Sequence, residues 1–295
     1  MSLKNNINVN GVCDVTVAVL TRNGGQVLRR LVTAVCNQQT DRHFELLAVD
    51  SGSADGTRAL LAEKGAAVVT IPSEDFNFGA ARDVAFEHAR GAIVVSLSQD
   101  AVPAHDRWLD NLVAPLEDAA VAASCGRSIP DPGRETPQFP WERNGYFYFT
   151  REMGKFSERY GKGLSNANSA IRRAVWERLR FGNQAIGEDF SFQTKLAAAN
   201  LRVAFPDDAP VLHHHDYTLR SLVKRCRNEG LGLRALGCAY SELDLLLDLM
   251  SPRKYLVWLR ELAAGRLVTP AAVAFPVVRP VAVYAGSRFG RRFAP

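Results

Sequence analysis

The sequence predicts an α/β fold, in which a mostly parallel sheet is covered by helices on both faces. Through the first 125 residues, short apolar runs rich in β-branched side chains alternate with stretches of helical periodicity. Strand–helix alternation of this kind is typical of parallel sheets. The strand-like runs are apolar along nearly their whole length, which is what burial on both faces of a sheet requires.

Five strands and four helices are expected in this region. The expected strands cover residues 15–20, 44–49, 67–71, 93–98 and 121–124. The expected helices cover residues 26–38, 55–64, 79–90 and 106–118. The first helix is predicted by apolar residues that recur at helical spacing, namely Leu28, Leu31, Val32 and Val35. The second helix follows a Ser/Gly/Asp turn that supplies an N-cap.

After Cys125 the composition changes and the regular alternation stops. Residues 126–165 are rich in Pro, Gly and aromatic side chains and are expected to form a long excursion. Further on we expect helices from Ala170 to Leu179, from Glu188 to Asn200 and from Tyr217 onward, and a strand from Ala209 to Leu212. The predicted organisation is a flexible N-terminus (1–12), two halves of one domain (13–125 and 126–238) and a C-terminal extension (239–295).

Composition and charge narrow the class of protein. The chain has 295 residues, of which 47% are hydrophobic and 23% charged, so it can bury a large core and is neither disordered nor collagen-like. With 36 basic and 31 acidic residues the net charge is only +5, but residues 251–295 hold eight basic residues and one acid. A basic tail on a nearly neutral body predicts a local anionic partner and no nucleic acid.

The cysteines and the apolar segments indicate the compartment. Five cysteines without CxxC spacing argue against a disulfide framework and favour the cytoplasm. The first residues show no apolar run that could serve as a secretory signal. The longest late uncharged stretch, Leu267–Val278, has 12 residues, whereas a spanning helix needs about 20 apolar residues. We therefore expect no membrane-spanning helix.

Residues 252–266 carry a helical stripe of large apolar side chains with cations beside it. The stripe consists of Tyr255, Leu256, Trp258, Leu259 and Leu262. This pattern is typical of a helix that lies in a membrane interface, and the basic segment 287–292 favours anionic lipid headgroups. The alternative is a helix packed on the main domain.

Polar residues follow three of the expected strands, at the point where each strand ends. They are Thr21-Arg22-Asn23, Asp50-Ser51-Gly52-Ser53 and Ser98-Gln99-Asp100. Ligands of open α/β sheets bind outside the carboxyl ends of the strands, so these residues predict a site there. The motifs GxGxxG after a strand, GxxxxGK[ST], GxSxG and HExxH do not occur, which disfavours dinucleotide oxidoreductases, P-loop NTPases, α/β-hydrolases and zincin proteases.

Three charged residues of this first half could carry chemistry. Asp50 could accept hydrogen bonds from a nucleobase or ribose, or it could cap the next helix. Arg82, one turn inside a helix, could pair with a diphosphate, or it could be a solvated helix arginine. Asp100 offers the carboxylate that Mg²⁺ or Mn²⁺ requires beside a phosphate site, or it could cap a loop.

In residues 126–238, acids, histidines and asparagines are the candidate functional residues. Glu188 and Asp189 are the first residues of a predicted helix. Side chains of adjacent helical residues point in directions about 100° apart, so only one of the two carboxylates can face a reacting atom. The helix dipole is expected to keep both ionised, and either could act as a general base or merely favour the first turn. His213 and His215 share one face of an extended segment and could ligate a cation, or they could form a His-rich turn. Asn166 and Asn168 are expected to be turn formers that could also contact a sugar.

Together these segments resemble family 2 glycosyltransferases with the GT-A fold, over residues 13–238. The motifs that carry the resemblance are VAVLTRNGG, VDSGSADGT, DFNFGAARD, LSQDAVP, SNANSAIRR, the EDF turn and HHHDYT. They follow the order of the bacterial rhamnosyltransferase-like branch. One short motif would be a weak signal, but seven in order are specific.

The resemblance implies an inverting glycosyltransferase that moves a sugar from a nucleotide-diphospho-sugar to a hydroxyl of a surface-polysaccharide or glycolipid acceptor. It implies dTDP-rhamnose as a candidate donor and Mg²⁺ or Mn²⁺ as cofactor. Residues 13–125 would then bind the nucleotide sugar and residues 126–238 the acceptor. The basic segment 252–295 would place the protein on the anionic inner face of the cell membrane.

The resemblance also implies a role for each candidate residue. The nucleotide-sugar-binding set is Thr21, Asn23, Asp50, Arg82, Gln99 and Asp100. Asp189 matches the catalytic base, and Glu188 beside it would position the base or bind the acceptor. Asp100 matches the last acid of the family's metal-binding Asp-x-Asp, and His213 or His215 matches its late metal or diphosphate histidine.

One position departs from the general family pattern. Ser98 replaces the first Asp of Asp-x-Asp, and the Gln-Asp-Ala variant that results is typical of the rhamnosyltransferase-like branch. The cation would therefore have fewer protein ligands. A non-catalytic sugar-nucleotide or polysaccharide-binding scaffold at the membrane is the alternative function. A nucleotidyltransferase would need a glycine-rich phosphate loop longer than TRNGG after the first strand.

Overall fold

The structure is a computed structural model that describes residues 13–133, 138–143, 151–213 and 215–290. The chain forms two compact units, each with its own core. We call them the sheet unit (Met1–Pro132, Gly163–Asn183 and Glu188–His214) and the helical unit (Gly133–Lys162, Gln184–Gly187 and His215–Pro295). This division interleaves the two units along the chain, and the expected boundary at residue 238 falls inside the helical unit. The expected flexible segment 1–12 lies outside the described residues.

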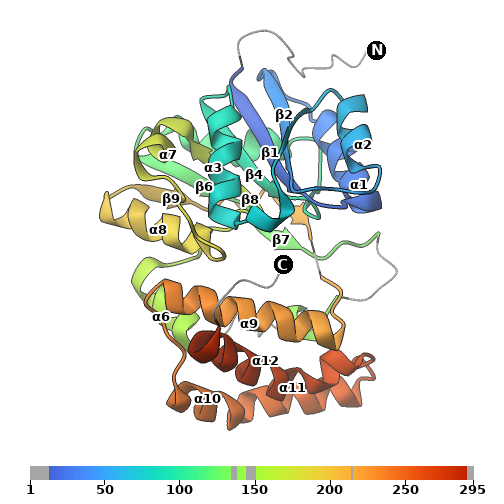
Figure 1. Ribbon diagram of the computed structural model, residues 1–295, viewed down its shortest axis with the longest axis vertical. Coiled ribbons are helices and arrows are strands. Elements are labelled where there is room, and N and C mark those ends of the chain that lie inside the picture. Colours follow the sequence, from blue (N-terminus) through green and yellow to red (C-terminus); the bar gives the residue numbers. More distant parts are fainter. Residues whose placement is uncertain (1–12, 134–137, 144–150, 214, 291–295) are drawn as a thin grey trace. The chain divides into compact units, whose positions relative to one another are not determined.

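The sheet unit is built on a seven-stranded sheet (Figure 1). In spatial order the strands are β3 (Ala67–Thr70), β2 (Phe44–Asp50), β1 (Val15–Thr21), β4 (Ile93–Ser98), β8 (Asn168–Arg172), β6 (Val121–Cys125) and β9 (Arg202–Ala204). The pairs among the first four are parallel, whereas β8 runs antiparallel to both of its neighbours. The five strands expected from the sequence are confirmed.

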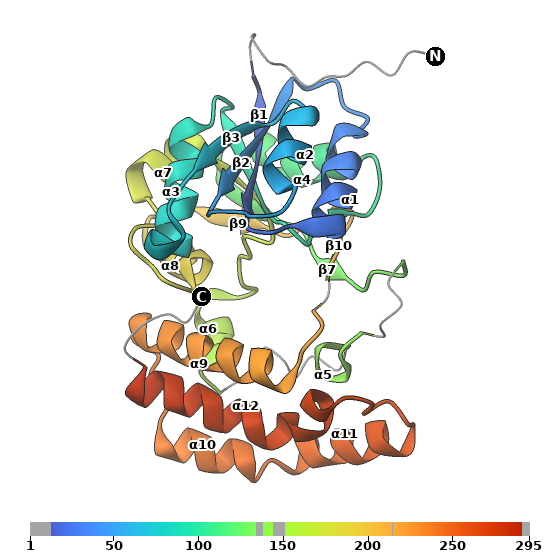
Figure 2. The same cartoon turned by 45° about the vertical axis from the view of Figure 1, so that its right-hand side comes forward.

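Helices cover both faces of this sheet, as predicted (Figure 2). One face is covered by α1 (Gly25–Cys36), α2 (Thr57–Glu63) and α4 (Trp108–Val113), whose apolar residues share a core with alternate residues of β1 and β2. The other face is covered by α3 (Phe78–His88), α7 (Arg173–Leu179) and α8 (Glu188–Ala198). Residues of β1 alternate between the two cores, because successive side chains of a strand point to opposite faces.

Two expected helices are shorter than the sequence pattern suggested. The helix expected at 106–118 ends at Val113, and a 3-10 turn (Ala114–Glu117) that contains Pro115 follows it, because proline has no N–H to continue an α-helix. The helix expected from Ala170 was wrong in its first residues, which belong to β8. Asn168–Arg172 fill the gap between β4 and β6, where burial and two ladders of hydrogen bonds outweigh helical spacing. Another short 3-10 turn covers Ser73–Asp75.

Asn168 is a structural residue and not a turn former as expected. Its side chain accepts a hydrogen bond from the indole Nε1 of Trp108 (3.0 Å) and donates to the carbonyl of Ala209 (2.8 Å). All three groups are buried. The buried amide of Asn168 uses both its oxygen and its NH₂ group in these hydrogen bonds, which link β8 to α4 and to the segment before β10. Neither group is then available to bind a ligand.

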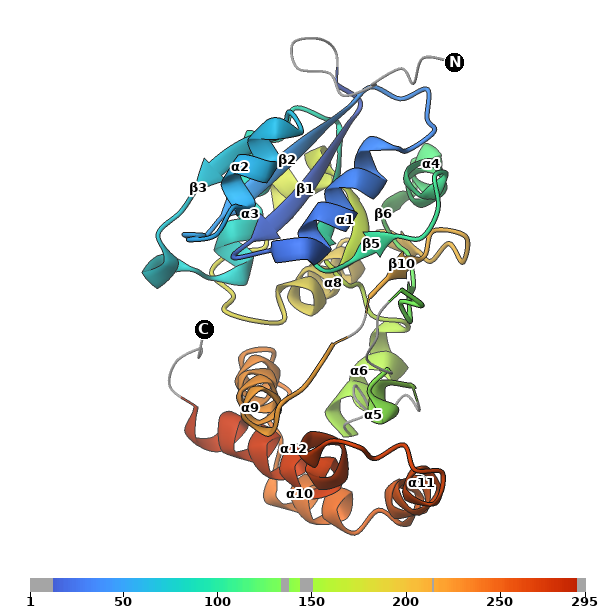
Figure 3. The same ribbon diagram turned by 90° about the vertical axis from the view of Figure 1, so that its right-hand side faces the viewer.

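A second, three-stranded sheet lies beside the carboxyl end of β4 (Figure 3). It contains β5 (Val102–Pro103), β10 (Val211–Leu212) and β7 (Ser128–Ile129). The strand expected at 209–212 is confirmed, whereas β5 and β7 were not expected because two-residue strands have no periodicity. In this sheet Leu212 pairs with Val102 in antiparallel register, which brings the residue after β10 close to the residues before β5.

The helical unit consists of α5 (Pro140–Arg143), α6 (Arg151–Tyr160), α9 (Leu219–Ala235), α10 (Glu242–Leu249), α11 (Pro252–Ala263) and α12 (Pro270–Phe289). Within it α12 lies between α9 on one side and α10 and α11 on the other (Figure 2). Helix α9 begins close to the expected position, where Thr218 caps it. Helices α9 and α12 approach closely at Gly230 and Gly286, where a Cβ atom would meet backbone oxygens at about 2 Å.

The helical unit has a core of its own. Trp141 of α5 stacks on Phe275 of α12, with the ring centroids 4.7 Å apart, and its indole donates a hydrogen bond to the carbonyl of Ala272. Arg279, buried within α12, forms two hydrogen bonds of 2.8 Å with Glu229 of α9. Among the described residues, none of the helices combines the length and the apolar character that a bilayer crossing demands.

Candidate active site

The three polar strand ends predicted to converge do converge at one edge of the sheet. β2, β1 and β4 are neighbours, and Thr21 is in register with Asp50 while Leu20 is in register with Ser98. Because all three strands are parallel, the residues that follow them emerge side by side at the same edge. The predicted convergence of the three strand ends is confirmed, and the binding site at this edge stays a prediction.

Asp50 is the centre of this edge, and it is completely buried. Its carboxylate accepts hydrogen bonds from Thr21 Oγ1 (3.1 Å), from the backbone N–H of Ser53 (2.9 Å) and from the Ser53 hydroxyl. The Arg58 guanidinium lies 3.9 Å away and balances its charge. A buried carboxylate with this many donors holds the loop after β2 in one conformation.

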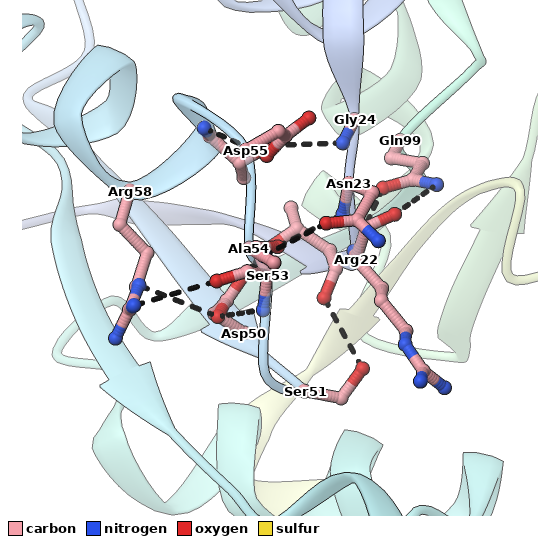
Figure 4. A network of polar contacts seen from close by, with 12 residues as sticks. Arg22, Asn23, Gly24, Asp50, Ser51, Ser53, Ala54, Asp55, Arg58 and Gln99 are labelled. Carbon is pink, nitrogen blue, oxygen red and sulfur yellow. Dashed lines mark hydrogen bonds and ion pairs between the residues drawn. The ribbon is translucent and has the colours of Figure 1, made fainter.

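The loop after β1 is tied to its two neighbours by further polar contacts (Figure 4). Asn23 adopts a left-handed backbone conformation (φ 50°), its N–H donates to Ser53 Oγ, and its side-chain oxygen accepts from the N–H of Ala54. Gln99 accepts from the N–H of Arg22 (2.9 Å) and donates to the carbonyl of the same residue (3.2 Å). Loops from three strands are thereby preorganised as one polar surface.

Asp100 and His213 are brought together by the small sheet. Asp100 precedes β5 and His213 follows β10, and the antiparallel pairing of these strands leaves His213 Nε2 at 3.3 Å from Asp100 Oδ1. The backbone N–H of His213 donates to the carbonyl of Ile129, which fixes the segment to β7. The sequence singled out both residues and predicted β10, but the pairing that joins them also depends on β5, whose two residues show no periodicity.

His215 begins the last of the three chain segments that make up the helical unit, and within that unit it has its own partner. Its Nδ1 atom lies 3.0 Å from Glu142 Oε1, and the hydroxyl of Tyr217 donates to the same oxygen. Glu142 was not singled out in the sequence, because a single acid in an aromatic-rich segment carries no motif. The assignment of His215 as a cation ligand stays a prediction.

Glu188 and Asp189 form the first turn of α8, as expected, but they lie in different surroundings. Glu188 is buried and accepts a hydrogen bond from the Asn166 side chain (3.1 Å). Asp189 accepts from its own helix at Phe190 N (2.9 Å) and, at 3.4 Å, from the backbone N–H of Asn166. Asn166 therefore connects the loop before β8 with both acids, a role the sequence did not indicate.

Arg82 was expected at a diphosphate, but the structure places it in the interior. Only 3% of the residue is exposed, and its guanidinium donates to the carbonyls of Leu97 and Asn166. Its Nε atom lies 3.9 Å from Glu188 Oε1 and has no hydrogen-bond partner among the residues that the structure describes. Arg82 is thus directed at the turn that holds the two acids, and burial lowers its pKa while Glu188 and Asp189 raise it.

The surroundings of Asp189 change its acidity. Burial, together with repulsion from Glu188, raises the pKa of Asp189 to about 7, although two backbone N–H groups and Arg82 act in the opposite direction. The expectation that the helix dipole keeps this acid ionised is therefore wrong, because desolvation outweighs the dipole. A carboxylate whose pKa lies close to neutrality is well matched to the work of a general base.

Comparison with known protein families identifies the sheet unit. The sequence model of "Glycosyl transferase family 2" matches residues 16–180. Among curated proteins, the O-antigen chain rhamnosyltransferase RfbN of Salmonella typhimurium is 31% identical over 227 residues, which cover 74% of this chain and 71% of that protein. The O-antigen chain rhamnosyltransferase WbaN of Salmonella anatum is 29% identical over 226 residues, covering 73% of this chain and 71% of that protein.

Solved structures share the fold at lower sequence identity. The mannosyltransferase PcManGT of Pyrobaculum calidifontis, solved in complex with GDP-Man and Mn²⁺, has a TM-score of 0.63 and 19% identity, covering 98% of this chain and 90% of that chain. Glucosyl-3-phosphoglycerate synthase of Mycobacterium tuberculosis, solved with Mn²⁺, UDP and glucosyl-3-phosphoglycerate, has a TM-score of 0.60 and 19% identity, covering 82% and 86%. The predicted GT-A fold class is confirmed.

Proposed function

The chain belongs to glycosyltransferase family 2, within its rhamnosyltransferase-like branch, and from that premise we propose that it transfers a sugar from a nucleotide-diphospho-sugar to an acceptor hydroxyl with inversion at the anomeric carbon. The observation that carries the proposal is the first turn of α8, where Asp189 lies beside the buried Glu188 and accepts a hydrogen bond from the backbone N–H of Asn166. Burial and the charge of Glu188 raise the pKa of Asp189 there. The same unit also contains the polar edge formed by Thr21, Asp50 and Gln99.

Asp189 is the proposed catalytic base. The acceptor oxygen attacks the anomeric carbon, the bond from that carbon to the diphosphate oxygen breaks, and Asp189 takes the proton of the hydroxyl. The hydroxyl becomes more acidic as its oxygen forms the new bond, so one carboxylate is sufficient. A glycosidase would need two carboxylates about 5–9.5 Å apart on either side of the bond.

Glu188 and Arg82 are proposed to position this base. Glu188 faces Arg82 and Asn166 and is buried, so it is not free to contact an acceptor without breaking these contacts. Arg82 holds the carbonyl of Asn166, whose N–H in turn donates to Asp189. Burial of Arg82 favours this positioning role over the direct diphosphate contact expected from the sequence.

The donor nucleotide is proposed to bind on the polar edge of the sheet. Thr21, Asn23 and Asp50 form its framework, with Gln99 linking the loops after β1 and β4. Because Asp50 is fully buried, we assign it the shaping of the loop that receives the nucleoside, while Asn23 and Gln99 lie nearer the surface.

Asp100 and His213 are the proposed ligands of a divalent cation. A carboxylate oxygen and an imidazole nitrogen suit Mn²⁺, and two ligand atoms on one such ion lie about 3 Å apart, compared with the 3.3 Å between Asp100 Oδ1 and His213 Nε2. Two structural neighbours were solved with Mn²⁺. When bound, the cation would neutralise charge on the departing diphosphate. His215 is a further proposed ligand, through its Nε2 atom, since a carboxylate such as Glu142 on Nδ1 is a usual second partner of a metal-binding imidazole.

The proposed donor is dTDP-rhamnose and the proposed acceptor a growing surface polysaccharide or glycolipid. The support is the similarity to two O-antigen chain rhamnosyltransferases. We also propose that the protein works in the cytoplasm, on the inner face of the cell membrane, and the support is the basic segment 252–295.

The experiment that tests the proposed function is an assay of the whole chain with a panel of sugar nucleotides in the presence of Mn²⁺ or Mg²⁺. Slow hydrolysis of one donor is expected even without an acceptor, because water can take the place of the hydroxyl. Calorimetric binding of the same donors provides an independent readout. Failure of every donor to bind or react would contradict the proposal.

A binding scaffold without catalysis is the second candidate function, and Ser98 in place of an acid is the feature that favours it. The two functions differ in one measurement. A transferase hydrolyses its donor slowly, and Asp100→Asn abolishes this hydrolysis, whereas a scaffold binds the donor and leaves it intact in both the parent chain and the variant.

A further inference from the structure

Helices α10 and α11 present apolar side chains to solvent and charged side chains to the interior. Seven large apolar residues, which we call the outer leucine stripe, are between 39% and 66% exposed: Leu243, Leu246, Leu247, Met250, Leu256, Leu259 and Leu262. Four lie on α10 or at its end and three on α11, at spacings of three and four residues. Each helix therefore presents one continuous apolar face.

The buried side of the same helices is polar, and its contacts fix their orientation. Glu261 is only 1% exposed, and it accepts hydrogen bonds from Arg266 (2.7 and 3.0 Å) and from Arg143. Lys254 is buried and donates to the carbonyls of Pro276 (2.7 Å) and Asp248. Rotating α11 to bury its leucines would break these contacts and leave charged groups without partners.

An ordinary water-soluble surface does not have this arrangement. Exposed apolar residues on such surfaces are usually scattered singly, and contiguous patches mark places where another molecule binds. The sequence analysis weighed a helix packed on the main domain against a helix in a membrane interface. Within the helical unit, α11 contacts α12 through the hydrogen bonds of Lys254 and Trp258 to backbone carbonyls, Val257 packs against the same core, and the leucines are left outside.

The charges beside the stripe indicate which molecule binds. Arg253, Arg260 and Arg266 on and just after α11 are exposed, whereas Glu261, the one acid among residues 251–295, is buried. The exposed surface of α11 is therefore cationic and apolar. Helix α10 carries acids and no cation, and its exposed Glu242 lies 3.9 Å from Arg288, so the attraction to an anionic surface comes from α11. Tyr255 and Trp258, which are half-buried, belong to the residue types that collect at the boundary between lipid and water.

We propose that the outer leucine stripe binds the surface of a bilayer that contains anionic lipids, with the leucines among the upper acyl chains and the arginines at the phosphates. A second copy of the chain is the competing occupant, and a dimer that the stripe variants abolish would identify it. The surface uses none of the residues assigned to sugar transfer, so its test is independent of that chemistry.

Co-sedimentation of the full chain with vesicles tests the proposal, using phosphatidylcholine alone and phosphatidylcholine with one third phosphatidylglycerol. We expect binding to the anionic vesicles and at least about tenfold weaker binding to the neutral ones. The double variant Leu256→Gln/Leu259→Gln should lose at least about tenfold in affinity for the anionic vesicles. Arg253→Gln should lose about fivefold, and only with the anionic vesicles.

Leu219→Gln on α9 is the matched control, because Leu219 is an exposed leucine of the same unit outside the stripe. It should bind vesicles as the parent chain does, and circular dichroism should show that all variants fold. The emission of Trp258, the one tryptophan of four that is not buried, should shift to the blue on binding. Absence of parent binding, or equal loss in Leu219→Gln, would overturn the proposal, as would dimerisation that the stripe variants abolish.

Discussion

Asp50 and Asp189 are two aspartates of the sheet unit, the first fully buried and the second half-buried. Their surroundings suit them to different roles. Asp50 ends a strand and accepts hydrogen bonds from Thr21 and twice from Ser53, with a guanidinium nearby. Asp189 opens a helix, accepts two backbone hydrogen bonds, one of them long, and faces Glu188. Hydrogen-bond donors favour the charged form of a carboxyl, whereas desolvation and a like charge favour the neutral form.

The hydrogen-bond donors and charged neighbours around an acidic residue distinguish one with a structural role from one that can exchange a proton. A carboxylate whose oxygens are all engaged cannot accept another proton without losing contacts that hold its loop. A carboxyl with few donors and an acidic neighbour has a raised pKa and can exchange a proton near neutral pH. Removing the charge by substitution with asparagine should therefore affect the two positions in different ways.

The largest expected effect is on turnover in Asp189→Asn. Asparagine keeps the shape of the side chain but cannot take a proton, so donor hydrolysis or transfer should fall by at least about 100-fold, the lower end of what a general base contributes. Donor affinity, measured by calorimetry, should change little, because Asp189 belongs to the reacting end of the site. Activity that survives in this variant would place the base on another residue.

Asp50→Asn should instead act on stability and donor binding together. An amide has one acceptor oxygen where the carboxylate has two. One of the buried N–H or O–H groups of Thr21 and Ser53 is then left without a hydrogen-bond acceptor, at a cost of about 1–3 kcal/mol. Thermal unfolding should show a lower Tm, and the donor Kd should rise because the loop after β2 is no longer held. An unchanged Tm would mean that Asp50 does not fix this loop.

Arg82→Gln should shift the pH profile of kcat/KM to higher pH. Arg82 lowers the pKa of Asp189 and pairs with Glu188, so its loss leaves two acids without a cation. The base must be deprotonated, and in the parent chain the acidic limb of the profile should lie near pH 7. The variant should reach full activity only above that limb. A uniform drop in rate with no shift would indicate a merely structural role.

Glu188→Gln should shift the same limb in the opposite direction. It removes the negative charge that, after burial, contributes most to raising the pKa of Asp189. The apparent pKa of kcat/KM should therefore fall by up to about one unit, so the variant keeps more of its activity at pH 6 than the parent chain does. Glu87→Gln, an exposed acid on α3 paired with Arg180, is the control that should not move the profile.

The sequence predicted the part of the fold that repeats a regular pattern. Apolar runs and helical periodicity identified β1, β2, β4 and their helices, and the order of these strands placed Thr21, Asp50 and Asp100 near one edge. The two-residue strands β5 and β7 carry no such pattern, so periodicity could not show the pairing that brings His213 to Asp100, although the family resemblance assigns both residues to the metal. The Asn168–Arg172 strand was missed because its neighbours in the sheet come from distant parts of the chain.

The sequence could name candidate site residues, but it could not show the surroundings in which the structure places them. Glu188 and Asp189 could be found from a motif, but burial of the turn, which decides the pKa of Asp189, depends on three-dimensional packing. Arg82 was recognisable as a residue of the site, whereas its direction toward Asn166 and not toward solvent follows from the burial of α3 on the sheet. Local sequence carries little information about desolvation.

The smallest expected effect is a gain of thermal stability in Asp189→Asn at alkaline pH, opposite in sign to the loss in Asp50→Asn. The folded-state pKa of Asp189, about 7, lies above its ordinary value of 3.8, so the proton favours the folded state, and this contribution disappears as the pH rises through 7. Asparagine cannot ionise, and its Tm should exceed that of the parent chain at pH 8, with a smaller difference at pH 5.5. Equal differences at both pH values would show that the buried charge of Asp189 is not the cause.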